Sequence, residues 1–146
     1  MDKGVTVYLP MVDSIRKWKD RKKKIRIPLF NSYVFVCINL KDRYTALQTD
    51  GVVRIISFSG EPAVIPDWQI QQLKQLIEIP DAIQLESYFN AGDWVEITEG
   101  PFIGVKGRLK EMRGETRLVV NIDGIMQSVS VVVDPTTVRK IEPVVI

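Results

Sequence analysis

The chain has 146 residues, of which 45% are hydrophobic and 26% charged, and its formal net charge is only +2. These values suit a globular chain of one domain or two small ones, and they exclude a uniformly basic chain. The sequence has no histidine and a single cysteine, Cys37, which excludes a histidine-dependent nucleophile, a CxxC metal site and an intrachain disulfide. No apolar run is long enough to cross a bilayer, and the start lacks a signal peptide's apolar stretch. We therefore expect a cytoplasmic protein that is not an enzyme and holds no metal or cofactor.

The first half of the chain mixes predicted strands with predicted helices. Residues 33–38 are apolar at every position, which predicts a strand covered on both faces. Helices can cover only one face of so small a sheet, so the other face is either covered by the linker or is an exposed apolar patch that marks an interface. Asp67, after a proline, is a good cap for the second helix, in which apolar residues recur three or four apart. The predicted elements are strands over residues 5–9, 33–38 and 52–58, a short helix that includes residues 40–47 and ends near Gly51, and a helix over residues 68–79.

From Gly92 onward the sequence predicts short strands only, separated by turn signals. Five short strands within roughly 55 residues are typical of a small barrel. Residues 80–91 show no periodicity, so we expect a linker there, between a domain over residues 1–79 and a barrel over residues 92–146. The predicted strands of the barrel are residues 93–98, 104–113, 116–122, 125–133 and 137–141.

Three glycines and a proline lie within residues 95–109, in a segment that otherwise reads as strand. Gly104 and Gly107 fall in a predicted strand, where glycine costs stability, so they indicate a bend, a bulge or a close backbone approach. Phe102 lies between the turn and the bend. It either plugs the end of the barrel or stands exposed as an anchor.

Residues 16–26 form the strongest charge feature, with eight basic side chains and one acidic one, a local charge of +7. One interpretation is contact with a nucleic-acid backbone, with Trp18 stacking on a base. The other is a solvated hairpin tip. The candidate nucleic-acid-binding residues are Arg16, Lys17, Trp18, Lys19, Arg21, Lys22, Lys23 and Lys24.

Two segments resemble a known family. The stretch GDWVEITEGPFIGVKGRLKEM, beginning at Gly92, resembles the KOW motif, and PLFNSYVFV resembles the phenylalanine-proline-glycine-tyrosine-valine strand of the NusG N-terminal domain. Asn31-Ser32 replaces the usual proline-glycine of that strand. DGVVRIISF and VIPDWQI also match, in the same order. The chain thus resembles the NusG family of transcription elongation and antitermination factors. Within that family, its sequence is most similar in character to the specialised antiterminators of capsular polysaccharide operons.

The resemblance implies an α+β N-terminal domain, with an antiparallel sheet and helices, followed by an SH3-like KOW barrel. It implies that the first domain binds the clamp helices of bacterial RNA polymerase beside non-template DNA, while the barrel recruits a ribosomal protein or a termination factor. The candidate polymerase-binding residues, which could equally be core, are Tyr8, Leu29, Phe30, Tyr33 and Phe35. The candidate partner contacts of the barrel are Phe102, Ile103, Ile125 and Met126.

The start of the chain departs from the family. Relatives open with a Trp-Tyr strand and an amphipathic helix, whereas this chain begins at what should be the second strand. Since the first strand is central in the family's sheet, we expect a truncated chain whose open edges are closed by a dimer, a domain swap or a rearranged sheet. The alternative class is a ribosomal or general RNA-binding KOW protein. Such a protein should carry basic barrel loops, and the charges here are mixed.

Overall fold

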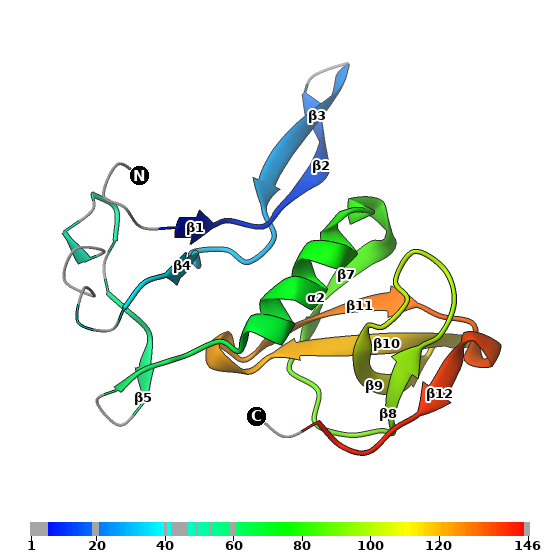
Figure 1. Ribbon diagram of the computed structural model, residues 1–146. Helices are drawn as coiled ribbons and strands as arrows, with labels where there is room; N and C mark the ends of the chain where they lie inside the picture. Colours follow the sequence, from blue (N-terminus) through cyan, green and yellow to red (C-terminus); the bar gives the residue numbers. More distant parts are fainter. Residues whose placement is uncertain are drawn as a thin grey trace.

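The computed structural model contains a six-stranded sheet, helix α2 (Asp67–Ile77) packed against it, and short N-terminal strands to one side (Figure 1). It describes residues 6–18, 21–39, 41, 47–48, 50–52, 54–58 and 61–144, and only the backbone at residues 14–18, 21–24 and 58. Most of the helix predicted over residues 40–47 lies outside the described residues. Within the described ranges, no helix is long and apolar enough to cross a membrane.

The larger sheet is antiparallel and runs in the order β12-β8-β9-β10-β11-β7. Arg113 and Gly114 join β9 to β10 with φ values of 53° and 79°, as a tight two-residue hairpin requires. All five strands predicted for the C-terminal half are present, while β7 is additional. The strands are β7 (Ile83–Ser87), β8 (Trp94–Ile97), β9 (Lys106–Met112), β10 (Glu115–Ile122), β11 (Gln127–Val132) and β12 (Val138–Lys140).

Residues 80–91, expected to be a linker, carry regular structure. The 3-10 turn η2 (Pro80–Ala82) leads into β7, which pairs with β11 from Ile83 opposite Val131 to Ser87 opposite Gln127. The expectation of an irregular segment is therefore wrong for residues 80–87. The sequence did not indicate this strand because five residues are too few to establish a period. The boundaries of the domains stay a prediction.

A largely buried ionic cluster fixes β7 to its neighbours. The Ser130 hydroxyl donates to Glu86 Oε1 over 2.9 Å, and Arg117 Nε donates to the Ser130 hydroxyl over 2.8 Å. The Glu86 carboxylate also lies 3.9 Å from Arg117 Nε and 3.9 Å from Lys110 Nζ. Because Glu86 belongs to β7 and its partners to β9, β10 and β11, this cluster joins four strands.

The segment that follows β7 is held by a side chain of β10. The Asn121 amide accepts from the Phe89 backbone N–H over 3.2 Å and donates to the Phe89 carbonyl over 2.7 Å. The Ser128 hydroxyl donates to the same Asn121 oxygen. An amide side chain that pairs with both backbone groups of Phe89 replaces the strand partner which this residue lacks.

Helix α2 is fixed to the sheet by three glutamines spaced one turn apart. The Gln69 amide donates to Asp123 Oδ2 over 2.9 Å, and the Gln72 amide both donates to the Lys106 carbonyl and accepts from its N–H. Gln75 Nε2 donates to the Ile103 carbonyl over 2.8 Å. Residues three apart share a helix face, so this spacing aligns all three amides with the sheet.

Asp67 does not cap α2 as predicted. Pro66 occupies the N-cap position, and Asp67 is the first residue of the helix, with no side-chain hydrogen bond at the cap. Its carboxylate still lies in the first turn, where the helix dipole favours negative charge.

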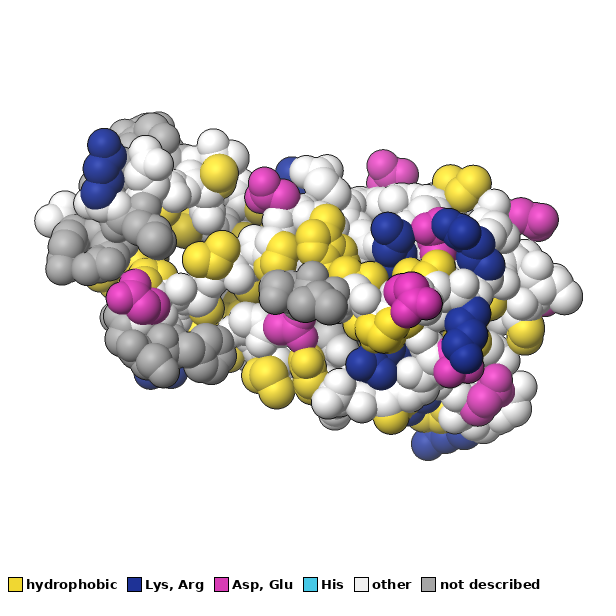
Figure 2. All heavy atoms as spheres, turned by 60° about the horizontal axis from the view of Figure 1, so that its bottom comes forward, with side chains coloured by type: hydrophobic (Ala, Val, Ile, Leu, Met, Phe, Trp, Pro, Cys, Tyr) yellow, Lys and Arg dark blue, Asp and Glu magenta, His cyan; other side chains and the backbone are white. Residues whose placement is uncertain are grey.

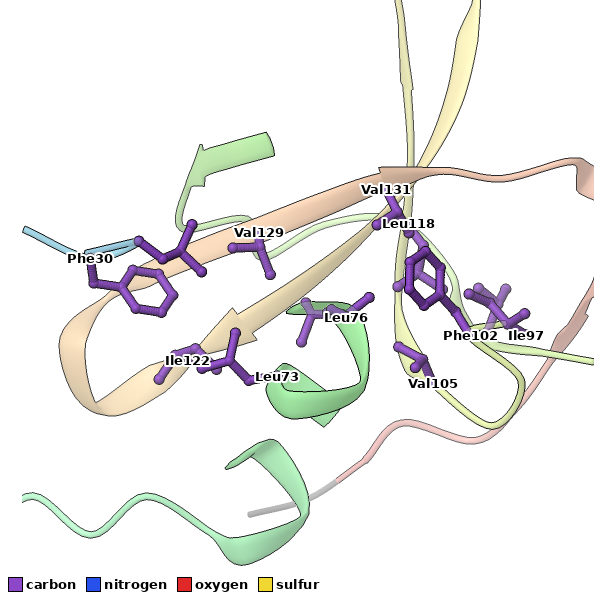
Figure 3. Close-up of a cluster of buried hydrophobic side chains, with 13 residues drawn as sticks. Phe30, Leu73, Leu76, Ile97, Phe102, Val105, Leu118, Ile122, Val129 and Val131 are labelled. Carbon is purple, nitrogen blue, oxygen red and sulfur yellow. The ribbon is translucent and has the colours of Figure 1, made fainter. Parts of the chain in front are cut away.

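The core is one cluster that includes residues from both parts of the chain (Figure 3). Leu73 and Leu76 of α2 are fully buried against valines and leucines of the sheet. Phe30, which is 1% exposed, lies at the end of the cluster near Ile122. The N-terminal part, α2 and the sheet therefore bury apolar area jointly, which makes them one cooperative packing unit.

The structure shows why glycines occupy positions 104 and 107. At Gly107 in β9, an added Cβ would lie 2.4 Å from the Val119 carbonyl oxygen of β10. Gly104 has a φ of +88° with open space around it, so it is a turn residue just before β9. The predicted close approach and bend both exist, at separate glycines.

The N-terminal strands form small two-stranded sheets. The strand predicted over residues 33–38 is shorter, because only β4 forms there. Among the described residues of the strand predicted over residues 52–58, only those of β5 form a strand. The pairs are β1 (Thr6–Tyr8) with β4 (Phe35–Cys37), β2 (Met11–Trp18) with β3 (Arg21–Pro28), and β5 (Ser57–Phe58) with β6 (Glu61–Pro62).

Candidate interaction surfaces

One face of the β1–β4 pair packs toward α2. The rings of Tyr8 and Phe35 stack with their centroids 6.3 Å apart, and Phe30 meets Phe35 edge-on at 6.2 Å. The Lys74 ammonium of α2 lies 5.2 Å from the centroid of the Tyr8 ring. Burial raises the pKa of the Tyr8 hydroxyl. This face is thus part of the shared core.

The other face of the same pair is apolar and open. Successive side chains of a strand point to opposite sides, so the neighbours of Tyr8 and Phe35 face outward. The four outward residues, which we call the outer apolar face, are between 38% and 46% exposed: Val7, Leu9, Val34 and Val36. Residues 33–38 are therefore not covered on both faces by the described chain. Of the two alternatives for the second face, the exposed apolar patch is the one observed.

The five candidate polymerase-binding residues lie together, but on the inward side. Leu29 and Phe30 are buried, and Tyr8, Tyr33 and Phe35 are partly buried against the core. Their role in binding stays a prediction. Sequence reasoning selected large aromatic residues and missed the valines between them, although the alternation of VTVYL and YVFV separates the two sets.

The described residues of the basic segment, 16–18 and 21–26, lie in the β2–β3 hairpin, which projects away from the six-stranded sheet (Figure 1). Its backbone register pairs Arg16 with Lys23, Lys17 with Lys22 and Trp18 with Arg21. Lys24 pairs with Ile15. Lys19 lies outside the described residues, as do the side chains of the other candidate nucleic-acid-binding residues. The backbone agrees with a hairpin, and the role of the charges stays a prediction.

The candidate contacts of the predicted barrel fall into two pairs. Phe102 is buried in the core and Ile125 is partly buried against it, whereas Ile103 and Met126 are well exposed. Phe102 is therefore not an exposed anchor in this structure, and its role as the plug of a barrel stays a prediction. Figure 2 shows basic and acidic side chains intermixed over the six-stranded sheet, at the right of the view. Over the described residues, no group of three acidic or cysteine side chains could hold a metal.

Comparison with known proteins identifies a family for the first half of the chain. The family described as "Transcription termination factor nusG" matches residues 1–74. A relative named "Transcription termination/antitermination protein NusG", from Rickettsia bellii (strain RML369-C), is 24% identical over 137 residues, covering 92% of this chain and 72% of the relative. Since the family match covers half of the chain, the chain belongs to the NusG family of transcription factors.

Proposed function

We propose that this chain acts in transcription elongation or antitermination by binding RNA polymerase through its N-terminal part. Membership of the NusG family supports this class of function. The observation that carries the proposal is the outer apolar face, because exposed contiguous apolar residues mark interaction sites. The clamp helices of the polymerase are the proposed partner. The inward aromatic residues hold this face in position.

The β-rich C-terminal part is proposed to be an SH3-like KOW barrel that recruits a second protein. Five of the six antiparallel strands, β8 to β12, with sharp glycine bends, support that assignment. Ile103 and Met126 are the proposed contacts, because both are exposed apolar side chains in turns. A ribosomal protein or a termination factor is the proposed partner.

Charge placed on the outer apolar face is expected to weaken polymerase binding strongly. The double variant Val34→Glu with Val36→Glu should weaken retention of bacterial core polymerase by about tenfold or more, since each carboxylate would be desolvated at the contact. A pull-down with the tagged full chain measures this. Both sites are exposed, so the variant should keep the native circular dichroism spectrum.

The matched control is Val132→Glu, at an exposed valine of β11 in the other part of the chain. It should retain polymerase as well as the wild type does. The proposal would be wrong if the wild-type chain retained no polymerase, or if both variants lost it equally.

The β2–β3 hairpin is proposed to contact the non-template strand through its basic residues. Replacing Lys22, Lys23 and Lys24 with glutamine should reduce the slope of log affinity against log salt by about 2, at roughly 0.7 for each single-strand phosphate contact. Fluorescence anisotropy with a labelled single strand at several salt concentrations measures the slope. Neutralising the exposed Arg113, Arg139 and Lys140 instead should leave it unchanged, and equal slopes for all three proteins would refute the contact.

A further inference from the structure

A cavity of about 420 Å³ is lined by residues from the first turn of α2 and from strands β9 and β10. Its volume falls within the range of small-ligand sites. Three aromatic residues line it, Trp68, Tyr88 and Trp94. None of the interaction surfaces described above includes this cavity.

A buried hydrogen-bond acceptor in the cavity wall has no donor. Gln69 is 1% exposed, and its Nε2 donates to one oxygen of Asp123. The other Asp123 oxygen accepts from the Tyr88 hydroxyl over 2.7 Å, a bond that raises the pKa of Tyr88 because ionisation would set two negative charges together. A carboxylate can only accept hydrogen bonds, so the Gln69 atom next to Asp123 must be the amide nitrogen, and the oxygen and nitrogen of this amide cannot be exchanged. Its Oε1 therefore faces no donor among the described residues, which costs about 1–3 kcal/mol when buried.

Cationic groups lie beside the aromatic rings. The Arg108 guanidinium carbon is 5.1 Å from the centroid of the Trp94 ring, and Arg108 also donates to the Gly92 carbonyl over 3.1 Å. Lys106 lines the same cavity. Two cations against the single carboxylate of Asp123 give the lining a net charge of +1. Both oxygens of that carboxylate are already engaged.

We propose that this cavity binds a nucleobase, carried by a single-stranded nucleic acid or by a free nucleotide. The aromatic side chains offer flat surfaces for stacking. Gln69 Oε1 is buried in this structure, and a turn of the side chain toward the cavity would let it accept from an amino or imino N–H of the base. Arg108 and Lys106 are the side chains for the phosphate. A purely apolar ligand would leave the Gln69 acceptor unpaired, and a bare phosphate would leave the aromatic surfaces unused. The proposal does not depend on polymerase binding.

Tryptophan fluorescence tests the proposal directly. In a Trp18→Phe background of the full chain, the two remaining tryptophans, Trp68 and Trp94, both line the cavity. We expect saturable quenching by at least one of the nucleoside monophosphates AMP, GMP, CMP and UMP, and none by ribose 5-phosphate. A short single-stranded oligonucleotide that binds more tightly than the monophosphate identifies a strand as the source of the base. Equal affinities identify a free nucleotide.

Three variants, measured by calorimetry, examine the contacts. Gln69→Met removes the acceptor and should weaken binding about tenfold. Gln71→Met makes the same change at an exposed position of α2 and should have no effect. Because Gln69 also bonds Asp123, Trp68→Leu provides a second route and should weaken binding about tenfold through lost stacking. The proposal is overturned if no nucleotide gives saturable quenching at millimolar concentration, if ribose 5-phosphate quenches equally, or if Gln71→Met weakens binding as much as Gln69→Met.

Discussion

Replacing Phe30 with alanine is expected to lower the free energy of unfolding by about 3–5 kcal/mol, the cost of truncating a buried phenylalanine. Phe30 is fully enclosed and contacts Phe35 edge-on, in the cluster that includes Leu73 of α2. The change would therefore leave a cavity where the N-terminal part meets the rest of the core. Urea unfolding, followed by circular dichroism, measures the effect.

Val34→Ala is the control, because Val34 lies four residues further on but is exposed. Its expected cost is within about 0.5 kcal/mol, as for most surface substitutions. Equal stabilities of the two variants would contradict a shared core.

Replacing Glu86 with alanine is expected to cost about 3 kcal/mol, because it leaves the buried Arg117 with one fewer anionic partner. The Glu86 side chain is only 9% exposed, and it is the group through which β7 joins the ionic cluster. Arg117 keeps Glu115 at 3.0 Å, which places the cost at the low end of the range for broken buried pairs.

Glu115→Ala provides the matched comparison on the same arginine. The Glu115 side chain is 53% exposed, so solvent screens its charge and the expected cost is at most about 1 kcal/mol. Thermal or urea unfolding distinguishes the two variants. If Glu115→Ala proved the more destabilising, the assignment of Glu86 as the anchor of β7 would be wrong.

Much of the secondary structure could be predicted, because its signals are local. The helix from Asp67 follows a 3.6-residue period, and the five C-terminal strands are divided by glycine and proline turns. Strand β7 could not be found in this way, since its five residues carry little pattern. It is also stabilised by a partner strand more than forty residues away, as in the pair of Glu86 with Ser128. Its stability comes from tertiary contacts rather than from local propensity.

The candidate sites were harder to predict than the fold. The sequence placed Tyr8 and Phe35 correctly on neighbouring strands, but only their packing against α2 shows that they face inward. Val34 and Val36 had the right alternation and were passed over in favour of larger rings. The cavity beside Gln69 joins α2, β9 and β10 with the segment after β7, so no single stretch of sequence could reveal it.

The most direct test of the account is the lifetime of RNA polymerase at a defined pause site, measured by single-round transcription with and without the purified chain. The account predicts a shorter pause that lengthens again when Val34 and Val36 carry glutamate. Pause lifetimes and terminator read-through that stay unchanged at saturating concentrations of the wild-type chain would contradict it.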